Sequence, residues 1–182
     1  MTRRLVAWAA ASAIGSASGA ASAAPAPTPA PSPAPAIRSD AWINADAAAA
    51  REWSGKVTIV EFWTFGCINC RRTVPAMKRL YADLAPRGVA IIGVHTPEFP
   101  HEAVPGAVRA AVTKHGIEFP VALDNDHAIW KAYKNRYWPA IYLIDRAGLI
   151  RATHVGELHV GTPEWDALLG EVEALLAEHP PK

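Results

Sequence analysis

A run of apolar residues from Val57 to Trp63 (VTIVEFW) is followed, after a loop of three residues, by a helical pattern that begins at Cys67. The run is rich in β-branched and aromatic residues without alternating polar ones, which is typical of a strand covered on both faces of a sheet. From Cys67 to Leu84 apolar residues recur at helical spacing, and Pro75 is expected to kink this helix. A buried strand that continues directly into a helix indicates an α/β architecture.

The same alternation continues to the end of the chain. Strands are expected at Val89 to His95, Val121 to Leu123, Ile141 to Asp145 and Leu149 to His154, and helices at Ala103 to His115, Asp126 to Tyr133 and Pro163 to Glu178. The last two strands are joined by Arg146-Ala147-Gly148, which reads as a hairpin turn. This order predicts a mixed sheet with helices on both faces.

The first 36 residues have a different composition, with 14 Ala, 6 Pro and only two charges, Arg3 and Arg4. Residues 1–24 combine a basic start, a weakly apolar middle and an A-x-A pattern at Ala21 to Ala23, so we interpret them as a secretory signal peptide. An uncleaved membrane anchor is the alternative, and the two arginines also match a twin-arginine signal loosely. Residues 25–36 (PAPTPAPSPAPA) favour polyproline II over helix or sheet and are predicted to be a spacer.

Residues 37–182 are the size of one domain, and their composition excludes some functions. Without the first 36 residues, Lys and Arg fall from 18 to 16 against 17 Asp and Glu, so the formal charge changes from +1 to −1. A nucleic-acid partner is therefore not expected. Two cysteines, both in one motif, can build neither a disulfide framework nor a four-ligand zinc site by themselves. The cysteine pair is therefore interpreted as a redox site.

The spacing Cys67-Ile68-Asn69-Cys70 at a strand-to-helix junction suits thiol chemistry. The first sulfur would lie at a helix N-terminus, where free N–H groups and the macrodipole stabilise a thiolate. Cys67 is thus the expected nucleophile, and Cys70, one turn further on, the thiol that resolves a mixed disulfide. Arg71 and Arg72 would add positive charge, or would simply be solvated helix residues.

Glu61 is an unexpected carboxylate inside the apolar run. Burial without an ionic partner would raise its pKa toward neutrality, which suits a group that takes the proton of Cys70. A Glu turned to solvent at the strand end is the alternative interpretation.

Trp138-Pro139 directly precedes the strand expected at Ile141 to Asp145. A proline at this place leaves the neighbouring backbone free to pair with a visiting peptide, so Trp138 and Pro139 are candidate substrate-binding residues. The sequence leaves open whether the bond between them is cis or trans.

These features together resemble a thioredoxin-fold protein. The features are Val60-Glu61-Phe62-Trp63, Cys67-x-x-Cys70, Pro75, Pro139 and Gly156, in this order between Ile37 and Glu178. More narrowly, the segments Phe62 to Cys70, Gly93 to Phe99, Ala122 to Asp126 and Asn135 to Pro139 are similar to the exported TlpA-like redoxins, especially the soluble domain of DipZ-type proteins.

The resemblance implies a thioredoxin-like three-layer sandwich with a helical insertion around residues 97–116. It also implies a protein-disulfide oxidoreductase that works outside the cytoplasm, without cofactor or metal, on protein thiols and disulfides. Cys67 would attack, Cys70 resolve, Glu61 be the buried acid and Pro139 the cis-proline. Because no multi-span membrane domain accompanies this chain, its redox partner is expected to be a separate, membrane-embedded protein, and the chain itself a monomer.

The chain departs from the family pattern at three places. Gly66 stands where many thioredoxins carry Trp, and Ile68-Asn69 replaces their Gly-Pro, so neither redox potential nor direction of electron flow can be transferred. Thr73 occupies the place where cytochrome-maturation members often carry Glu, which gives a role in haem-protein maturation less support.

Two further residues, His95 and Glu98, are candidates for a role near the thiols. His95, at a strand end, is expected to be a structural histidine, or else to approach the thiols or a metal. Glu98 either approaches the thiols and modulates them or is a surface carboxylate.

The competing function is a copper chaperone in which Cys67 and Cys70, with or without His95, hold Cu(I).

Overall fold

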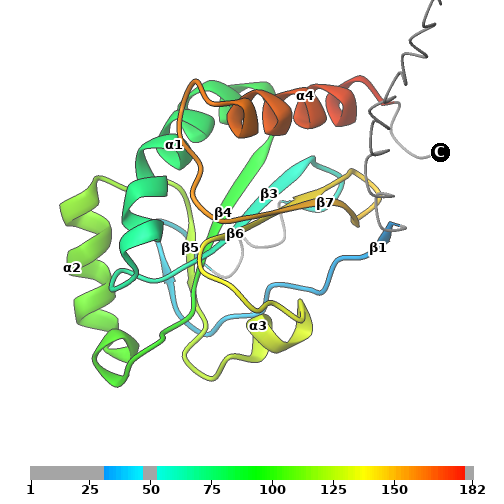
Figure 1. Cartoon of the computed structure of the whole chain (residues 1–182). Helices are drawn as coiled ribbons and strands as arrows, with labels where there is room; N and C mark the ends of the chain where they lie inside the picture. Colours follow the sequence, from blue (N-terminus) through cyan, green and yellow to red (C-terminus); the bar gives the residue numbers. More distant parts are fainter. Residues whose placement is uncertain (1–30, 47–52, 179–182) are drawn as a thin grey trace, which may run out of the picture.

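The computed structural model describes residues 31–46 and 53–178, which form one mixed sheet with helices on both faces (Figure 1). The sheet order is β1-β7-β6-β3-β4-β5-β2. The strands are β1 (Ser32–Pro33), β2 (Trp42–Ile43), β3 (Thr58–Trp63), β4 (Ala90–His95), β5 (Val121–Leu123), β6 (Ala140–Ile144) and β7 (Leu149–Val155). The α-helices are α1 (Ile68–Leu84), α2 (Pro105–His115), α3 (Ala128–Ala132) and α4 (Pro163–Ala177), with short 3-10 turns η2 (Ala85–Arg87) and η3 (Pro100–Ala103). The expected α/β thioredoxin-like fold is confirmed.

Strand β3 lies at the centre of the sheet order and pairs on both sides, parallel to β4 and antiparallel to β6. All six of its residues are buried, as the unbroken apolar run predicted. Successive side chains of a strand point to opposite faces. Ile59 and Trp63 therefore enter the core beneath α1, α2 and α4, whereas Val60 and Phe62 enter the core on the α3 face.

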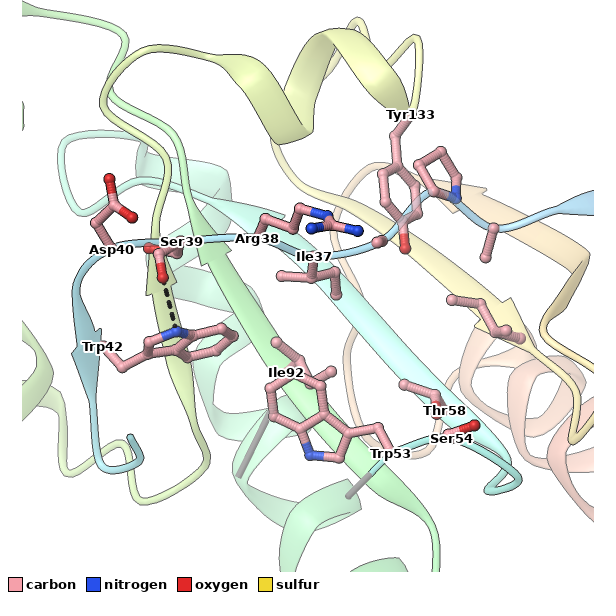
Figure 2. Close-up of a pocket in the computed structure, with 14 residues that line it drawn as sticks. Ile37, Arg38, Ser39, Asp40, Trp42, Trp53, Ser54, Thr58, Ile92 and Tyr133 are labelled. Atoms are coloured by element: carbon pink, nitrogen blue, oxygen red, sulfur yellow. Dashed lines mark hydrogen bonds between the residues drawn. The ribbon is translucent and has the colours of Figure 1, made fainter. Parts of the chain in front are cut away.

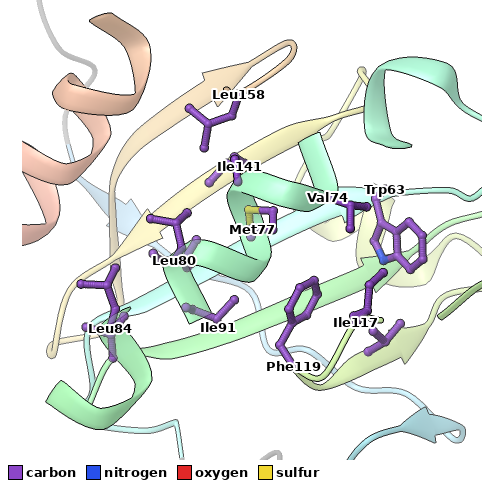
Figure 3. Close-up of a cluster of buried hydrophobic side chains, with 14 of the residues drawn as sticks. Trp63, Val74, Met77, Leu80, Leu84, Ile91, Ile117, Phe119, Ile141 and Leu158 are labelled. Atoms are coloured by element: carbon purple, nitrogen blue, oxygen red, sulfur yellow. The ribbon is translucent and has the colours of Figure 1, made fainter. Parts of the chain in front are cut away.

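The larger core lies between the sheet and α1 (Figure 3). Val74, Met77, Leu80 and Leu84 of α1 contact it at helical spacing, and none of them is more than 3% exposed. Figure 3 shows these side chains pointing to Ile91 of β4 and the neighbouring strands. Packing of this face holds the N-terminus of α1 at the end of β3.

Some element boundaries differ from the predictions for identifiable reasons. The helix expected from Ala103 is divided, because Val104 is extended and Pro105 starts α2. Helix α3 is shorter than expected, because His127 before it adopts a positive φ of 59°. Two carboxylates accept N–H groups at its start: Asp126 accepts that of Ala128, and Asp124 accepts those of Ile129 and Trp130. The helical insertion around 97–116 is present as η3 and α2.

The Pro-rich spacer was expected to stay out of the sheet, and for its last part this is wrong. Ser32 lies opposite Ile150 in an antiparallel pair, and the Ala34 N–H donates to Gly148 O at 2.8 Å. Proline is tolerated there because β1 is an edge strand with a free side. The predicted signal peptide and residues 25–30 of the spacer lie outside the described residues.

Candidate functional site

The two cysteines lie where β3 ends and α1 begins. Cys67 is the N-cap of α1, with extended backbone, and its Sγ accepts the N–H of Cys70 at 3.3 Å. Both thiols are free; Cys67 is half-buried, whereas Cys70 has no exposed surface. Only Cys67 can therefore be reached from outside, which suits the predicted order of attack by Cys67 and resolution by Cys70.

Cys70 retains its proton in this environment. Burial raises the pKa of its thiol above the ordinary value of 9.0, and a hydrogen bond to the Cys67 side chain and the nearby Glu61 raise it further. A hydrogen bond from the backbone N–H of Thr64 lowers the pKa of Cys70. Attack by Cys70 thus requires a group that removes this proton.

Glu61 lies on the face of the sheet that carries the cysteines. It falls between Ile59 and Trp63, which both enter the core with Cys70, so the strand alternation directs its carboxyl to the same side. The residue is 1% exposed, and its Oε1 has no hydrogen-bond partner. Burial raises its pKa from 4.5 to about 8. The alternative of a Glu turned to solvent is wrong, while its role as proton acceptor remains a prediction.

The peptide bond between Trp138 and Pro139 is cis. The Cys67 Sγ lies 3.8 Å from the Trp138 carbonyl oxygen, so this segment borders the reachable sulfur. The indole of Trp138 is half-buried, stacks on Trp130 at 4.0 Å between ring centroids, and donates to Thr96 O at 3.1 Å. These two contacts fix the indole of Trp138, so only the exposed part of its ring can contact a substrate.

His95 is fully buried next to the loop that precedes Cys67. Its Nε2 is 3.3 Å from the Thr64 hydroxyl oxygen, and its ring stacks on Phe65 at 5.6 Å. Burial lowers its pKa from 6.5 to about 4, so the imidazole is neutral at physiological pH. Among residues 31–46 and 53–178, no three His, Cys, Asp or Glu side chains are arranged to hold a metal ion.

Local sequence patterns pointed to Glu98 but not to Glu102. The side chain of Glu98 is exposed, and only its backbone N–H takes part, donating to Glu102 Oε2 at 2.6 Å. Glu102 has no exposed surface and lies against Gly66, one residue before Cys67. Glu102 lies three residues after Phe99, the N-cap of η3, but Phe99 is not a capping residue type, and no local pattern predicts the contact with Gly66.

A cavity of about 800 Å³ lies away from the cysteines (Figure 2). It is bounded by the segment from Ala34 to Asp40 and by Trp42, Trp53 and Tyr133, over the α3 face of the sheet. The residues that line it include neither thiol, so the cavity is not part of the redox site.

Within the described part of the chain, none of the helices has both the length and the hydropathy that a membrane span requires.

A family match, two relatives and a solved structure show which known proteins this chain is similar to. The AhpC/TSA family matches residues 33–153. Protein DipZ of Mycobacterium tuberculosis is 48% identical over 103 residues, which are 57% of this chain but only 15% of DipZ. Thiol-disulfide oxidoreductase YkuV of Bacillus subtilis is 28% identical over 116 residues, 64% of this chain and 78% of YkuV. A crystal structure of a thioredoxin-like superfamily protein matches with a TM-score of 0.71 and 30% identity, covering 82% of this chain and 99% of the other.

Proposed function

Because this chain belongs to the AhpC/TSA family and has the thioredoxin-like fold, we propose that it is a thiol–disulfide oxidoreductase that acts on proteins outside the cytoplasm. The observation that carries the proposal is the asymmetry of the cysteine pair. A reachable Cys67 at a helix N-terminus adjoins a covered, protonated Cys70 beside the buried carboxyl of Glu61. This arrangement provides a nucleophile, a resolving thiol and a proton acceptor in one place.

In the reducing direction, the Cys67 thiolate attacks one sulfur of a substrate disulfide. The substrate S–S bond breaks, a mixed disulfide forms at Cys67, and the released substrate thiolate takes a proton from water. Glu61 in its ionised form then accepts the proton of Cys70, and the Cys70 sulfur attacks Cys67. The products are a Cys67–Cys70 disulfide and a substrate with two thiols, so two electrons have passed to the substrate. Oxidation of a substrate is the same sequence in reverse.

The central test compares two single-cysteine variants in the reduction of insulin by dithiothreitol. Cys67→Ser removes the nucleophile and is expected to abolish catalysis. Cys70→Ser keeps the nucleophile, so it should accumulate a mixed disulfide with substrate that dithiothreitol releases. Catalysis by Cys67→Ser, or a mixed disulfide formed through Cys70 instead, would refute the assignment.

The role of Glu61 is tested separately by rapid mixing. Glu61→Gln keeps the shape of the side chain but cannot accept a proton. It should slow release of the mixed disulfide by roughly 10²-fold or more, with little effect on its formation. Equal slowing of both steps would argue against proton transfer by Glu61.

Export is proposed from residues 1–36, which have the composition of a signal peptide followed by a spacer. When this segment is fused to a reporter that is active only outside the cytoplasm, the reporter should be active. Mass spectrometry of the exported protein should show that its N-terminus follows Ala23 or Ala24. Replacement of Arg3 and Arg4 by Lys then distinguishes twin-arginine from general export. A reporter that stays inactive contradicts the proposal.

The direction of electron flow depends on the potential of the Cys67–Cys70 couple. Equilibration with glutathione measures it: a value of about −270 mV is typical of reducing thioredoxins, and one of about −120 mV of strong oxidants.

A further inference from the structure

The segment between β4 and α2 brings a second buried carboxyl to the redox site. Glu102 of η3 has no exposed surface, and its Oε2 accepts the N–H groups of Glu98 at 2.6 Å and Phe99 at 3.0 Å. These bonds orient the other oxygen, Oε1, toward the loop before Cys67. A Cβ placed on Gly66 would be 1.8 Å from this Oε1. The carboxyl of Glu102 therefore occupies the space that any other side chain at position 66 would need.

The loop that Glu102 touches is the connection between β3 and the first cysteine. Thr64, at its start, meets His95 through its hydroxyl and Cys70 through its backbone N–H. Phe65, in the middle, stacks on His95 and contacts the ring of His101 at 5.9 Å. Gly66, at its end, touches Glu102. The insertion thus contacts this loop at two points, and the loop in turn contacts both cysteines.

The charge of Glu102 differs from that of Glu61. Burial by itself would raise the pKa of Glu102, but the N–H groups of Phe99 and Glu98 and the side chains of Thr64 and His95 outweigh it, so the pKa is below its usual value. At neutral pH the site therefore holds an anion at Glu102 and a largely protonated carboxyl at Glu61. The side chain of Thr64 stabilises this anion from the loop side, while Oε1 of Glu102 and Nδ1 of His95 have no hydrogen-bond partner among the described residues.

We propose that Glu102 is a positioning residue for thiol–disulfide exchange: its carboxylate holds the loop from Thr64 to Gly66 in place and keeps a negative charge against Gly66, the residue before Cys67. This inference rests on the proposed function and adds the insertion to the redox site. It explains why Gly66 stands where many thioredoxins carry Trp, since the carboxyl of Glu102 occupies that volume. A negative charge against the residue before Cys67 opposes a second negative charge there, so it limits how readily Cys67 reacts.

The test measures the rate of iodoacetamide alkylation of the resting, reduced protein as a function of pH. Cys70 is covered, so the rate reports on Cys67. The titratable and charged groups around the loop are Glu61 of β3, Cys70, Arg71 and Arg72 of α1, His95 of β4, and Glu98, His101 and Glu102 of the insertion. Glu102→Gln retains an oxygen for the two N–H groups and removes only the charge. We expect the pH midpoint of alkylation to fall by about half a unit to one unit.

Glu98→Gln is the matched control, since it removes the same charge from an exposed side chain four residues away. Screening by water should leave its midpoint within about 0.2 units of the parent. An unchanged midpoint in Glu102→Gln, or equal shifts in the two variants, would overturn the proposal. Because no protein substrate is involved, this outcome is independent of the insulin assay, so failure here and failure of the proposed function are distinguishable.

A double-mutant cycle tests the contact itself. Gly66→Ala places a methyl group on Glu102 Oε1 and should lower the urea midpoint of unfolding in the parent protein. In Glu102→Ala the space is open, so the same substitution should lower the midpoint much less. Additive effects would show that the two residues do not act on each other and would overturn the positioning role.

Discussion

Replacing Glu61 by Gln should change how the stability of the reduced protein depends on pH. Burial raises the pKa of Glu61 from 4.5 to about 8 in the folded protein. The unfolded chain therefore loses this proton near pH 4.5, whereas the folded protein keeps it until about pH 8. Since the folded state binds the extra proton between these values, its stability must fall as the pH rises through this range. Gln cannot ionise, so the variant lacks this contribution.

The magnitude follows from the pKa difference. One pH unit of full proton difference corresponds to about 1.36 kcal/mol. Between pH 6.5 and 8 the folded carboxyl begins to ionise as well, so the loss is about 1–2 kcal/mol. Most of the contribution of His95 lies below this window, between its folded pKa of about 4 and its ordinary 6.5, and both proteins contain His95. The window also lies below the ordinary pKa of the Cys70 thiol, 9.0.

Urea unfolding of both proteins in excess reductant, at half-unit steps from pH 6.5 to 8, measures the difference. Relative to Glu61→Gln, the parent should lose about 1–2 kcal/mol of unfolding free energy across the window. Glu118→Gln, at an exposed carboxylate, should remain parallel to the parent. If the curves for the parent and Glu61→Gln are parallel as well, the buried carboxyl does not hold its proton at neutral pH, and the reasoning about its role in proton transfer fails.

Three other substitutions test the fold and the site by urea unfolding. Leu80→Ala opens a cavity beneath α1, where Leu80 has no exposed surface, and should lower the free energy of unfolding by about 2–5 kcal/mol; a loss below 1 kcal/mol would contradict the packing. Thr162→Ala removes the hydroxyl that accepts the Trp165 N–H at the start of α4 and should cost about 1 kcal/mol, whereas Thr162→Ser should cost much less. Between pH 6.5 and 5 the parent should lose about 1–2 kcal/mol of stability, because its His95 imidazole protonates near pH 6.5 when unfolded and near 4 when folded. His95→Gln should remove this loss, and retention of the full loss in the variant would exclude His95 as its source.

Local patterns predicted most of the regular structure. Strand β3 and helix α1 follow from an unbroken apolar run and a helical repeat, and both have nearly the predicted bounds. Pro163 starts α4 as predicted, with Thr162 as its N-cap, because a capping hydroxyl and a first-turn proline act within a few residues. The edge strands β1 and β2 were not predicted, since two residues are too few to carry a periodic signal.

The sequence by itself determined the chemistry available to this protein: two thiols one helical turn apart, and a carboxyl on the same face of the preceding strand. These relations depend on helix and strand periods, which are properties of the local backbone. Only the tertiary structure decided that Cys70 is covered while Cys67 is reachable, and that the Trp138 carbonyl lies beside the Cys67 sulfur. It also decided that a carboxyl 36 residues beyond Gly66 fills the space next to it. Burial and such contacts join residues far apart in the chain, and their energies depend on packing and desolvation that no short segment encodes.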